Sequence, residues 1–496
     1  MAEKSDNRRT YLLTKSKYII GLQCPKYLWT VFHEPDKIPE PDEATQFRFD
    51  QGNIIGELAH KLFPGGINIP TSDFSANLEL SKKLLAGRKP LFEAAFSEDD
   101  IYSRADILEP AGKDAWDIIE VKSSTEVKDV YLEDVAFQRY CYEKAGLKIR
   151  KSFVMVINNQ YVKDGDIDPK RLFKREEVTE EIDKISDKIP ERIEQMLQII
   201  ESKDYPIIKI GKICHDPYGC PLEEQCWKFL PKNNVFDLYR GGKLSEDLLE
   251  KEILAIKDIP EEIKLNDKQG IQRDCERTGK PHIHKENIKH FLKGLHYPLH
   301  YLDFETFNTV IPLYDGVRPY QQVPFQFSLH IVEKEGAKPK HVYFLASGKG
   351  DPRPAFLEEL KQGIGEEGTI VVYNESFEKA RLKELSEAFP KEKKWIADVL
   401  ARFVDLLVPF RNFSYYHPNQ RGSASIKEVM PALVGRSYSE LDIANGGAAS
   451  MAFLDITFEK TPEKERKKLR DNLEKYCGRD TEGMIWIVDK LNEIVK

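Results

Sequence analysis

The feature that most constrains this chain is a pair of carboxylates inside an apolar run. Residues 299–307 read LHYLDFETF, so Asp303 and Glu305 stand among aromatic and aliphatic side chains. Such a run after Pro298 predicts a buried β-strand, and the alternation of side chains along a strand places both carboxylates on one face. Two like charges in a buried position are costly unless an opposite charge neutralises them. The segment therefore predicts a strand that carries a divalent metal site.

The length of the chain predicts more than one domain. Its 496 residues exceed what one ordinary hydrophobic core accommodates. The content of 41% hydrophobic and 32% charged residues is typical of a folded, soluble chain. We expect an N-terminal domain over 1–235, a charged connecting module over 236–297 and a C-terminal domain over 298–496.

The sequence also narrows location and partners. No apolar run approaches the roughly 20 residues that cross a bilayer, and the N-terminus lacks the apolar stretch of a secretory signal. We therefore expect a cytoplasmic protein without a membrane partner. The net charge of −8 does not exclude nucleic acid, because local basic patches and clustered carboxylates matter more than the total charge.

A second pair of carboxylates lies in a predicted β-hairpin. The strand-like runs IYSRADILEP and AWDIIEVKSS are joined by AGKD, with the turn at Gly112. Folding back the second strand brings Asp106 level with Glu120, and Lys122 shares a face with Glu120. Two carboxylates can hold a metal ion, and an ammonium group can polarise a water molecule. A surface ion pair between Glu120 and Lys122 is the alternative interpretation.

This arrangement resembles the PD-(D/E)XK nuclease superfamily, in the RecB-like branch that includes CRISPR-associated iron–sulfur exonucleases. His60, in GELAHKLFP, matches the histidine on a helix that precedes the core in that branch. The resemblance implies that Asp106, Glu120 and His60 hold a metal ion. It also implies that Lys122 assists the attacking water. Ala105 stands where the family's motif has proline.

A helical motif supports the same resemblance. Gln138 and Tyr142, in QRYCY, match the Q-x-x-x-Y motif of that branch, and residues four apart meet on one face of a helix. The resemblance implies that these two residues shape the site and contact nucleic acid. It also implies DNA as the partner, with single-stranded or free ends as the expected form.

Four of the seven cysteines suggest a metal centre. Cys214, Cys220 and Cys226 are separated by five residues each, and Cys24 lies near the N-terminus. Four thiolates suit a 4Fe–4S cluster or tetrahedral zinc. The lack of a C-x-x-C pair favours the cluster, as does the cysteine layout of the RecB-like branch. The alternative is that they are small buried apolar residues, which is our expectation for the other three: Cys141, Cys275 and Cys477.

Two later motifs extend the acidic pair at 303 and 305. In TIVVYNESFEKARLKEL a predicted strand runs into a helix that carries Glu378. In LEKYCGRDTEG a helix carries Tyr476 and Asp480 four residues apart, hence on one face. The order D-x-E, N-x-x-F-acid and Y-x-x-x-D resembles the tyrosine subclass of the DnaQ-like DEDD exonucleases, which have the ribonuclease H fold.

This second resemblance implies a site for two divalent ions, Mg²⁺ or Mn²⁺, about 4 Å apart, that act on the attacking and leaving oxygens of a phosphodiester. Tyr476 would orient or activate the attacking water. Glu378 departs from the family, which usually has Asp there. Asp405, in RFVDLLVPF, is an acid that either compensates or caps a turn. The four implied metal ligands are Asp303, Glu305, Glu378 and Asp480.

Together the resemblances imply an α/β protein with an N-terminal restriction-endonuclease-like PD-(D/E)XK core and a C-terminal ribonuclease H-like mixed sheet flanked by helices. They imply metal-dependent hydrolysis of DNA, most naturally at single-stranded ends, in DNA repair, recombination or defence. A helicase or repair protein is an expected partner. Two alternatives stay open: a nucleic-acid-binding adaptor with one degenerate nuclease site, and an RNA exonuclease acting through the C-terminal domain.

Overall fold

The computed structural model describes residues 11–496, and the chain divides into two compact units. Unit 1 extends to Lys228 and includes the segment Thr309–Tyr320, whereas unit 2 comprises Phe229–Asn308 and Gln321–Lys496. The expected connecting module, 236–297, therefore lies within unit 2. A short segment from the expected C-terminal domain belongs to unit 1. No helix in the described range is both long and apolar enough to cross a membrane.

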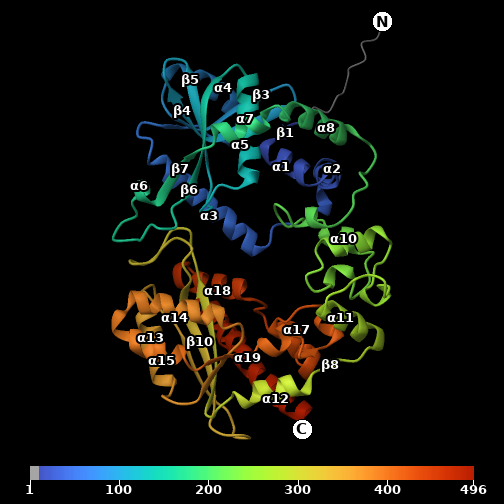
Figure 1. Ribbon diagram of the computed structural model, residues 1–496. Coiled ribbons are helices and arrows are strands. Elements are labelled where there is room, and N and C mark those ends of the chain that lie inside the picture. Colours follow the sequence, from blue (N-terminus) through green and yellow to red (C-terminus); the bar gives the residue numbers. More distant parts are fainter. Residues whose placement is uncertain (1–10) are drawn as a thin grey trace. The chain divides into compact units, whose positions relative to one another are not determined.

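A seven-stranded mixed sheet forms the centre of unit 1 (Figure 1). The strand order is β2-β3-β4-β5-β6-β7, with β1 paired to β4. Neighbours from β3 to β5 are antiparallel, β5 and β6 are parallel, and β6 and β7 are antiparallel. The strands are β1 (Leu13–Thr14), β2 (Ile67–Asn68), β3 (Leu91–Glu98), β4 (Ile101–Ala111), β5 (Ala115–Val121), β6 (Lys148–Ile157) and β7 (Phe173–Glu177).

The β4–β5 hairpin confirms the turn predicted from the sequence. Gly112 has a φ of +58°, a conformation that glycine adopts readily because it has no Cβ. Ile107 pairs with Ile119 in register. Because the strands are antiparallel, the residue before Ile107, Asp106, lies opposite the residue after Ile119, Glu120.

Helices cover both faces of this sheet. One core cluster packs α1, α5 and α8 against the face that includes Ile118, and another packs α3 against the face that includes Ile119. Because side chains alternate along β5, Glu120 lies on the α5 side. The helices of unit 1 are α1 (Lys15–Gln23), α2 (Pro25–His33), α3 (Glu43–His60), α4 (Phe74–Leu84), α5 (Asp129–Lys144), α6 (Pro169–Leu172), α7 (Thr179–Ser186), α8 (Ile189–Glu201) and α9 (Glu223–Trp227).

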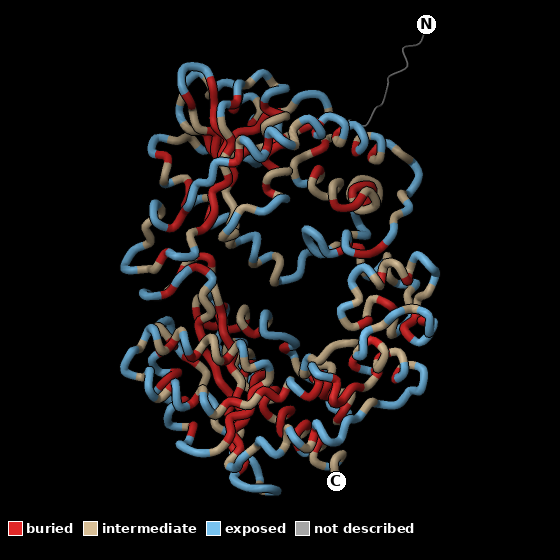
Figure 2. Tube along the Cα trace, viewed as in Figure 1, coloured by how far each residue is buried: buried red, intermediate tan, exposed pale blue. Residues whose placement is uncertain are grey.

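Unit 2 is built around a five-stranded mixed sheet with the order β11-β10-β9-β12-β13. The neighbours β11, β10 and β9 are antiparallel, whereas β9, β12 and β13 are parallel. Figure 2 shows that buried positions concentrate along the strands of this sheet other than β11, whose residues are exposed or partly buried. The strands are β9 (Leu299–Phe307), β10 (Val323–Val332), β11 (Lys340–Leu345), β12 (Thr369–Val372) and β13 (Phe403–Asp405).

The predicted strand at 299–307 is β9, and its two faces differ in the way the sequence indicates. Leu302 and Phe304 belong to the core that α13 (Arg353–Gly363), α14 (Ser376–Ala388) and α15 (Lys393–Leu400) form on one side of the sheet. Asp303 and Glu305 alternate with them. They face the other side, where α18 (Gly446–Phe458) and α19 (Glu463–Val495) contact β9.

The rest of unit 2 consists of helices and one two-stranded sheet. The antiparallel strands β8 (His282–Ile283) and β14 (Tyr415–Tyr416) join residues of the 236–297 region to the later part of the unit. A mixed α/β architecture is therefore present in both units. The remaining helices are α10 (Lys243–Glu250), α11 (Asp267–Thr278), α12 (Lys285–Lys293), α16 (Val408–Arg411) and α17 (Ile426–Val434).

Candidate active sites

Three elements that are distant in sequence bring carboxylates together in unit 2. β9 contributes Asp303 and Glu305, the first turn of α14 contributes Glu378, and α19 contributes Asp480. Asp303 interacts electrostatically with each of the other three carboxylates. The structure therefore gathers all four acids that the sequence singled out. We call this group the acidic cluster: Asp303, Glu305, Glu378 and Asp480.

The charged form of the acidic cluster is costly in the folded protein. Burial, together with the charges of Asp405 and Asp480, raises the pKa of Glu378 to about 8. Burial raises the pKa of Asp480 to about 6. Burial and then the neighbouring carboxylates raise the pKa values of Asp303 and Glu305 well above their usual range. Cations bound among these groups would remove the repulsion.

Two side chains that border the cluster were not predicted. The Tyr438 hydroxyl donates a hydrogen bond to Asp480 Oδ1. Lys427, on α17, opposes the effect of burial by lowering the pKa values of Glu305 and Asp480. Its Nζ lies 5.3 Å from the centre of the Tyr476 ring. Burial and the nearby carboxylates raise the pKa of the Tyr476 hydroxyl far above its usual value, so this group stays protonated.

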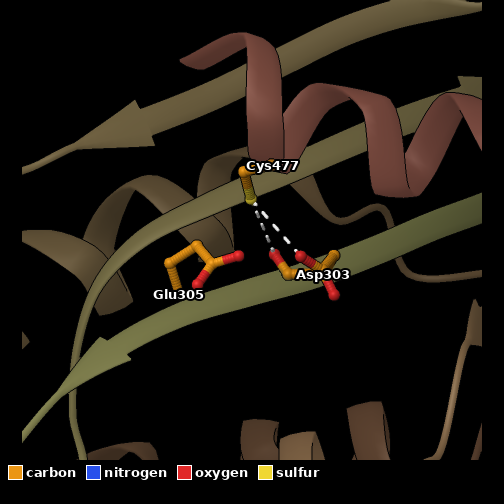
Figure 3. A group of neighbouring side chains, drawn as sticks. All are labelled: Asp303, Glu305 and Cys477. Carbon is orange, nitrogen blue, oxygen red and sulfur yellow. Dashed lines mark hydrogen bonds between the residues drawn. The ribbon is translucent and has the colours of Figure 1, made fainter. Parts of the chain in front are cut away.

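The structure also corrects the expectation for Cys477, which does not pack as a plain apolar residue. Figure 3 shows its thiol pointing toward Asp303 and Glu305. Its Sγ lies 3.5 Å from Asp303 Oδ2, and ligand atoms of the three residues all lie within 4.8 Å of one another. A sequence signal existed: Cys477 precedes Asp480 by three residues on α19, a spacing that puts both on one helix face.

The donor set of the acidic cluster fits divalent cations. Carboxylate oxygens are the ligands that Mg²⁺ and Mn²⁺ prefer, and a thiol favours softer ions. Glu378 Oε2 is buried without a hydrogen-bond partner among the described residues. Asp405 Oδ1, by contrast, accepts hydrogen bonds from the backbone N–H groups of Asn374 and Leu407, both at 2.9 Å. Asp405 therefore caps a turn, as one of the two interpretations expected, while its charge still acts on Glu378.

In unit 1, Glu120 is the centre of a buried charge network. It is only 2% exposed, so the pair with Lys122 is not a surface ion pair. The ammonium groups of Lys15 and Lys122 both lie 2.7 Å from Glu120 Oε1. Gln138 Nε2 donates to Glu120 Oε2 at 2.7 Å, and Lys122 also pairs with Asp134 at 2.7 Å. Lys15 and Asp134 were not predicted, because they come from α1 and α5 rather than from the hairpin.

Asp106 and Glu120 titrate in opposite directions. Burial and the charge of Glu120 raise the pKa of Asp106 to about 7. Burial alone would raise the pKa of Glu120 as well, but Lys122 and Lys15 lower it far below its usual value. Asp106 Oδ2 accepts a hydrogen bond from the Val121 N–H at 2.7 Å. The pair therefore combines one ionised carboxylate with one that changes charge near neutral pH.

His60, the third predicted metal ligand of unit 1, lies at the end of α3. Its ring stacks on Phe92 with the ring centres 3.9 Å apart. Burial lowers its pKa, and its Nε2 has no hydrogen-bond partner among the described residues. Within residues 11–496, the donor atoms of His60, Asp106 and Glu120 do not all lie within 4.8 Å of one another. The role of His60 as a ligand stays a prediction.

Gln138 and Tyr142 are both fully buried. Gln138 orients Glu120, as described above. The Tyr142 hydroxyl donates to Ala94 O at 2.5 Å and accepts from the Ala105 N–H at 2.8 Å, so it joins α5 to β3 and β4. In this structure the two residues support the site from within. Direct contact with nucleic acid, which the resemblance implied, is not available to side chains without exposed surface.

The four cysteines predicted to form a metal centre lie together in unit 1. Cys24 directly follows α1. Burial, and then the thiols of Cys214 and Cys226, raise the pKa of Cys24. Burial and the other three thiols of the set raise the pKa of Cys220. Gln23 Nε2 donates to Ile213 O at 3.0 Å and to Tyr218 O at 2.6 Å. These bonds connect α1 to the segment 213–226, which carries the other three cysteines and is called the cysteine loop below.

Similar proteins give a family match and distant relatives. Residues 300–425 match a family model described as a domain of unknown function, DUF2779. The uncharacterized protein MG366 of Mycoplasma genitalium is 29% identical over 216 residues, which cover 40% of this chain and 32% of the relative. The uncharacterized protein UU173 of Ureaplasma parvum is 26% identical over 209 residues, which cover 37% of this chain and 30% of the relative.

The matched regions span about a third of the length of these relatives. The family match includes the part of the acidic cluster on β9 and α14. It ends before α19, which carries Tyr476 and Asp480.

Proposed function

We propose that the chain is a metal-dependent nuclease that hydrolyses phosphodiester bonds of DNA, with single-stranded ends as the expected substrate and one site in each unit. The observation that carries this proposal is the convergence of Tyr476 and four carboxylates, three of them buried and Asp303 partly buried, from β9, α14 and α19. The mixed sheet between two helix layers supports a DnaQ-like ribonuclease H fold for unit 2. The β4–β5 hairpin with Asp106 and Glu120 supports a PD-(D/E)XK core for unit 1.

The side chains of unit 2 have separable roles in this proposal. The four acids of the acidic cluster would hold two Mg²⁺ or Mn²⁺ ions, which supply a water nucleophile and stabilise the leaving oxygen of a phosphodiester. Tyr476, protonated at neutral pH, can donate a hydrogen bond that orients the attacking water. Tyr438 holds Asp480 in one orientation. Lys427 supplies a positive charge beside the site for the phosphate.

In unit 1, Asp106 and Glu120 would hold the metal ion and Lys122 would assist the water. The pKa of Asp106 near neutrality allows it to lose its proton when a cation binds. Lys122 is held by Glu120 and Asp134, which fixes its ammonium group beside the hairpin. The four cysteines, whose thiols interact with one another, would hold a 4Fe–4S cluster as the structural centre of this unit, with zinc as the alternative.

One observation favours a second candidate function for unit 1, a site that binds nucleic acid without cutting it. Both oxygens of Glu120 are already occupied, Oε1 by two ammonium groups and Oε2 by Gln138. A metal ion at Oε1 would have to displace an ammonium group, and Oε2 keeps a single lone pair besides the one that accepts from Gln138. The chain would then be an adaptor in unit 1 and a nuclease in unit 2.

The test is cleavage of single strands labelled at either end, with Mn²⁺ or with EDTA. Asp303→Asn is compared with Asp398→Asn, an exposed acid of the same unit, and Asp106→Asn with Asp114→Asn, an exposed acid of the same hairpin. We expect Asp303→Asn and Asp106→Asn each to remove a distinct product ladder. Cleavage that is unaffected by Asp106→Asn supports the adaptor function of unit 1.

Absence of cleavage of any strand by the wild type, with Mn²⁺ and with Mg²⁺, would refute the nuclease proposal. Matched DNA and RNA strands in competition decide between DNA hydrolysis and RNA processing by unit 2.

A further inference from the structure

An open pocket of about 490 Å³ lies in unit 1 directly after β5. Its wall combines the loop that follows Lys122, the start of α5 and the end of the segment 309–320. The side chains that matter for its chemistry are three hydroxyl groups, one ammonium group and two tyrosine rings, from Ser123, Ser124, Thr125, Lys128, Tyr131 and Tyr320.

The pocket adjoins the Asp106–Glu120 site through Lys122. The Lys122 ammonium group lies 5.3 Å from the centre of the Tyr131 ring and 2.7 Å from Glu120 Oε1. A ligand against Tyr131 is therefore one side chain away from the proposed metal ligands. The pocket is therefore next to the proposed catalytic residues of unit 1.

Tyr320 is held in place although its ring is partly open to solvent. Its hydroxyl donates a hydrogen bond to Ser123 O, and its side chain is 37% exposed. Tyr320 and Tyr131 both line the pocket. The residue belongs to a segment whose Val310 and Ile311 are packed in the α3 core. The segment thus presents one fixed aromatic ring at the pocket.

A third tyrosine belongs to the region around Tyr131 and Lys122. Tyr218, from the cysteine loop, is 51% exposed and interacts electrostatically with Tyr131 and Lys122. The Lys122 ammonium group therefore lies beside the ring of Tyr131, and tyrosines from two other segments, Tyr218 and Tyr320, belong to the same region. Aromatic rings beside cationic groups are the usual platform on which unpaired bases stack, whereas hydroxyl and ammonium groups bind phosphate.

We propose that this pocket binds one nucleotide of a single strand, with the base against Tyr320 and Tyr131 and the phosphate at Lys128 and the hydroxyls of Ser123 and Thr125. The proposal rests on the proposed function of unit 1, either as nuclease or as adaptor. It gives the segment 309–320 a role in substrate binding and assigns the base and the phosphate of one nucleotide to separate side chains.

The first experiment locates the strand on the full chain in EDTA. A short single strand with one 5-iodouracil is cross-linked by light, and the modified peptides are identified by mass spectrometry. We expect cross-links at Tyr320 or Tyr131, reduced about tenfold by Tyr320→Ala, in line with the loss of one stacked base. Cross-links confined to other tyrosines, or a yield at Tyr131 that Tyr320→Ala leaves unchanged, would overturn the proposal.

The second experiment uses matched variants and strand affinity in EDTA as a function of salt. Lys128→Gln should reduce the slope of log affinity against log salt by about 0.7, as expected for one lost phosphate contact. Lys148→Gln, on β6 beside Ala115 at the opposite end of β5, should leave the slope unchanged. Tyr320→Phe, which keeps the ring and loses the bond to Ser123, should bind like the wild type. Equal losses in Tyr320→Phe and Tyr320→Ala would show a structural role and refute stacking.

Cleavage separates this proposal from the function on which it rests. In an Asp303→Asn background, any remaining cleavage comes from unit 1, and Tyr320→Ala should raise its KM about tenfold with little change in kcat. Cleavage with an unchanged KM refutes the pocket and keeps the nuclease. Strand binding in the pocket without cleavage keeps the pocket and refutes the nuclease function of unit 1.

Discussion

Glu378→Gln tests whether the acidic cluster repels itself in the folded protein. Burial and the charges of Asp405 and Asp480 raise the pKa of Glu378 from 4.5 to about 8. A group whose pKa is raised on folding stabilises the fold below its unfolded pKa and loses this contribution as the pH rises through its folded pKa. Glutamine imitates the neutral acid at every pH. The substitution should therefore be nearly neutral at pH 5 and stabilising at pH 9.

The size of the effect follows from the shift. A rise from 4.5 to about 8 corresponds to about 5 kcal/mol above pH 8. Part of this cost is shared with the other carboxylates and stays when one charge is removed, so we expect a gain of about 2 kcal/mol. For a unit of about 250 residues, this raises the melting temperature by about 4–8 °C.

Calorimetry in EDTA at pH 5 and pH 9 measures this gain, with Glu387→Gln, an exposed acid on the same helix, as the control. The relevant transition is the one that Asp303→Asn also shifts. Mn²⁺ at a hundred times its dissociation constant should increase the free energy of unfolding of the wild type by about 2.7 kcal/mol. The increase should be smaller in Glu378→Gln. Equal destabilisation by Glu378→Gln at both pH values would refute the reasoning, because the carboxylate would then stabilise the metal-free fold.

Four further substitutions test individual contacts. Tyr438→Phe removes the bond to Asp480, so the acidic limb of the pH–rate profile should move up by roughly 0.5–1 unit; an unmoved limb contradicts this. Gln23→Ala removes two hydrogen bonds to the cysteine loop and should speed the loss of the visible absorption of the proposed iron–sulfur cluster when a chelator is added. An unchanged rate would show that other contacts hold this loop. Tyr142→Phe leaves a buried N–H unpaired and should lower the free energy of unfolding of unit 1 by about 1–3 kcal/mol, whereas a neutral effect would mean that water replaces it. Cys477→Ser should weaken Zn²⁺ binding more than Mg²⁺ binding, measured by calorimetric titration; equal weakening would exclude the thiol as a ligand.

Sequence motifs predicted which side chains lie together wherever the residues belong to one helix, strand or turn. The alternation along β9 predicted that Asp303 and Glu305 share a face, and the i, i+4 spacing on α19 did the same for Tyr476 and Asp480. The glycine turn of the β4–β5 hairpin was readable for the same reason, since a positive φ at a tight turn favours glycine. In each case the backbone period alone fixes which side chains meet.

Partners from other elements could not be predicted, because tertiary packing decides which segments meet. Lys15 reaches Glu120 across 105 positions of sequence, and Tyr438 reaches Asp480 from a loop without regular structure. The segment 309–320 follows β9 directly but belongs to unit 1. No local pattern distinguishes such residues from surface lysines, tyrosines and loops, so only the fold reveals them.

Helix α1 connects Glu120 of the β4–β5 hairpin to the cysteine loop. Lys15 is the first residue of α1 and Cys24 follows its last residue. One end of this helix therefore places an ammonium group on Glu120 Oε1, and the other end is tied to the cysteine loop through Gln23. A nine-residue helix spans about 13 Å and moves as one body. A metal ion at Glu120 Oε1 would displace Lys15 or Lys122, and the hydrogen bond of Gln23 to Ile213 O restrains the helix that carries Lys15.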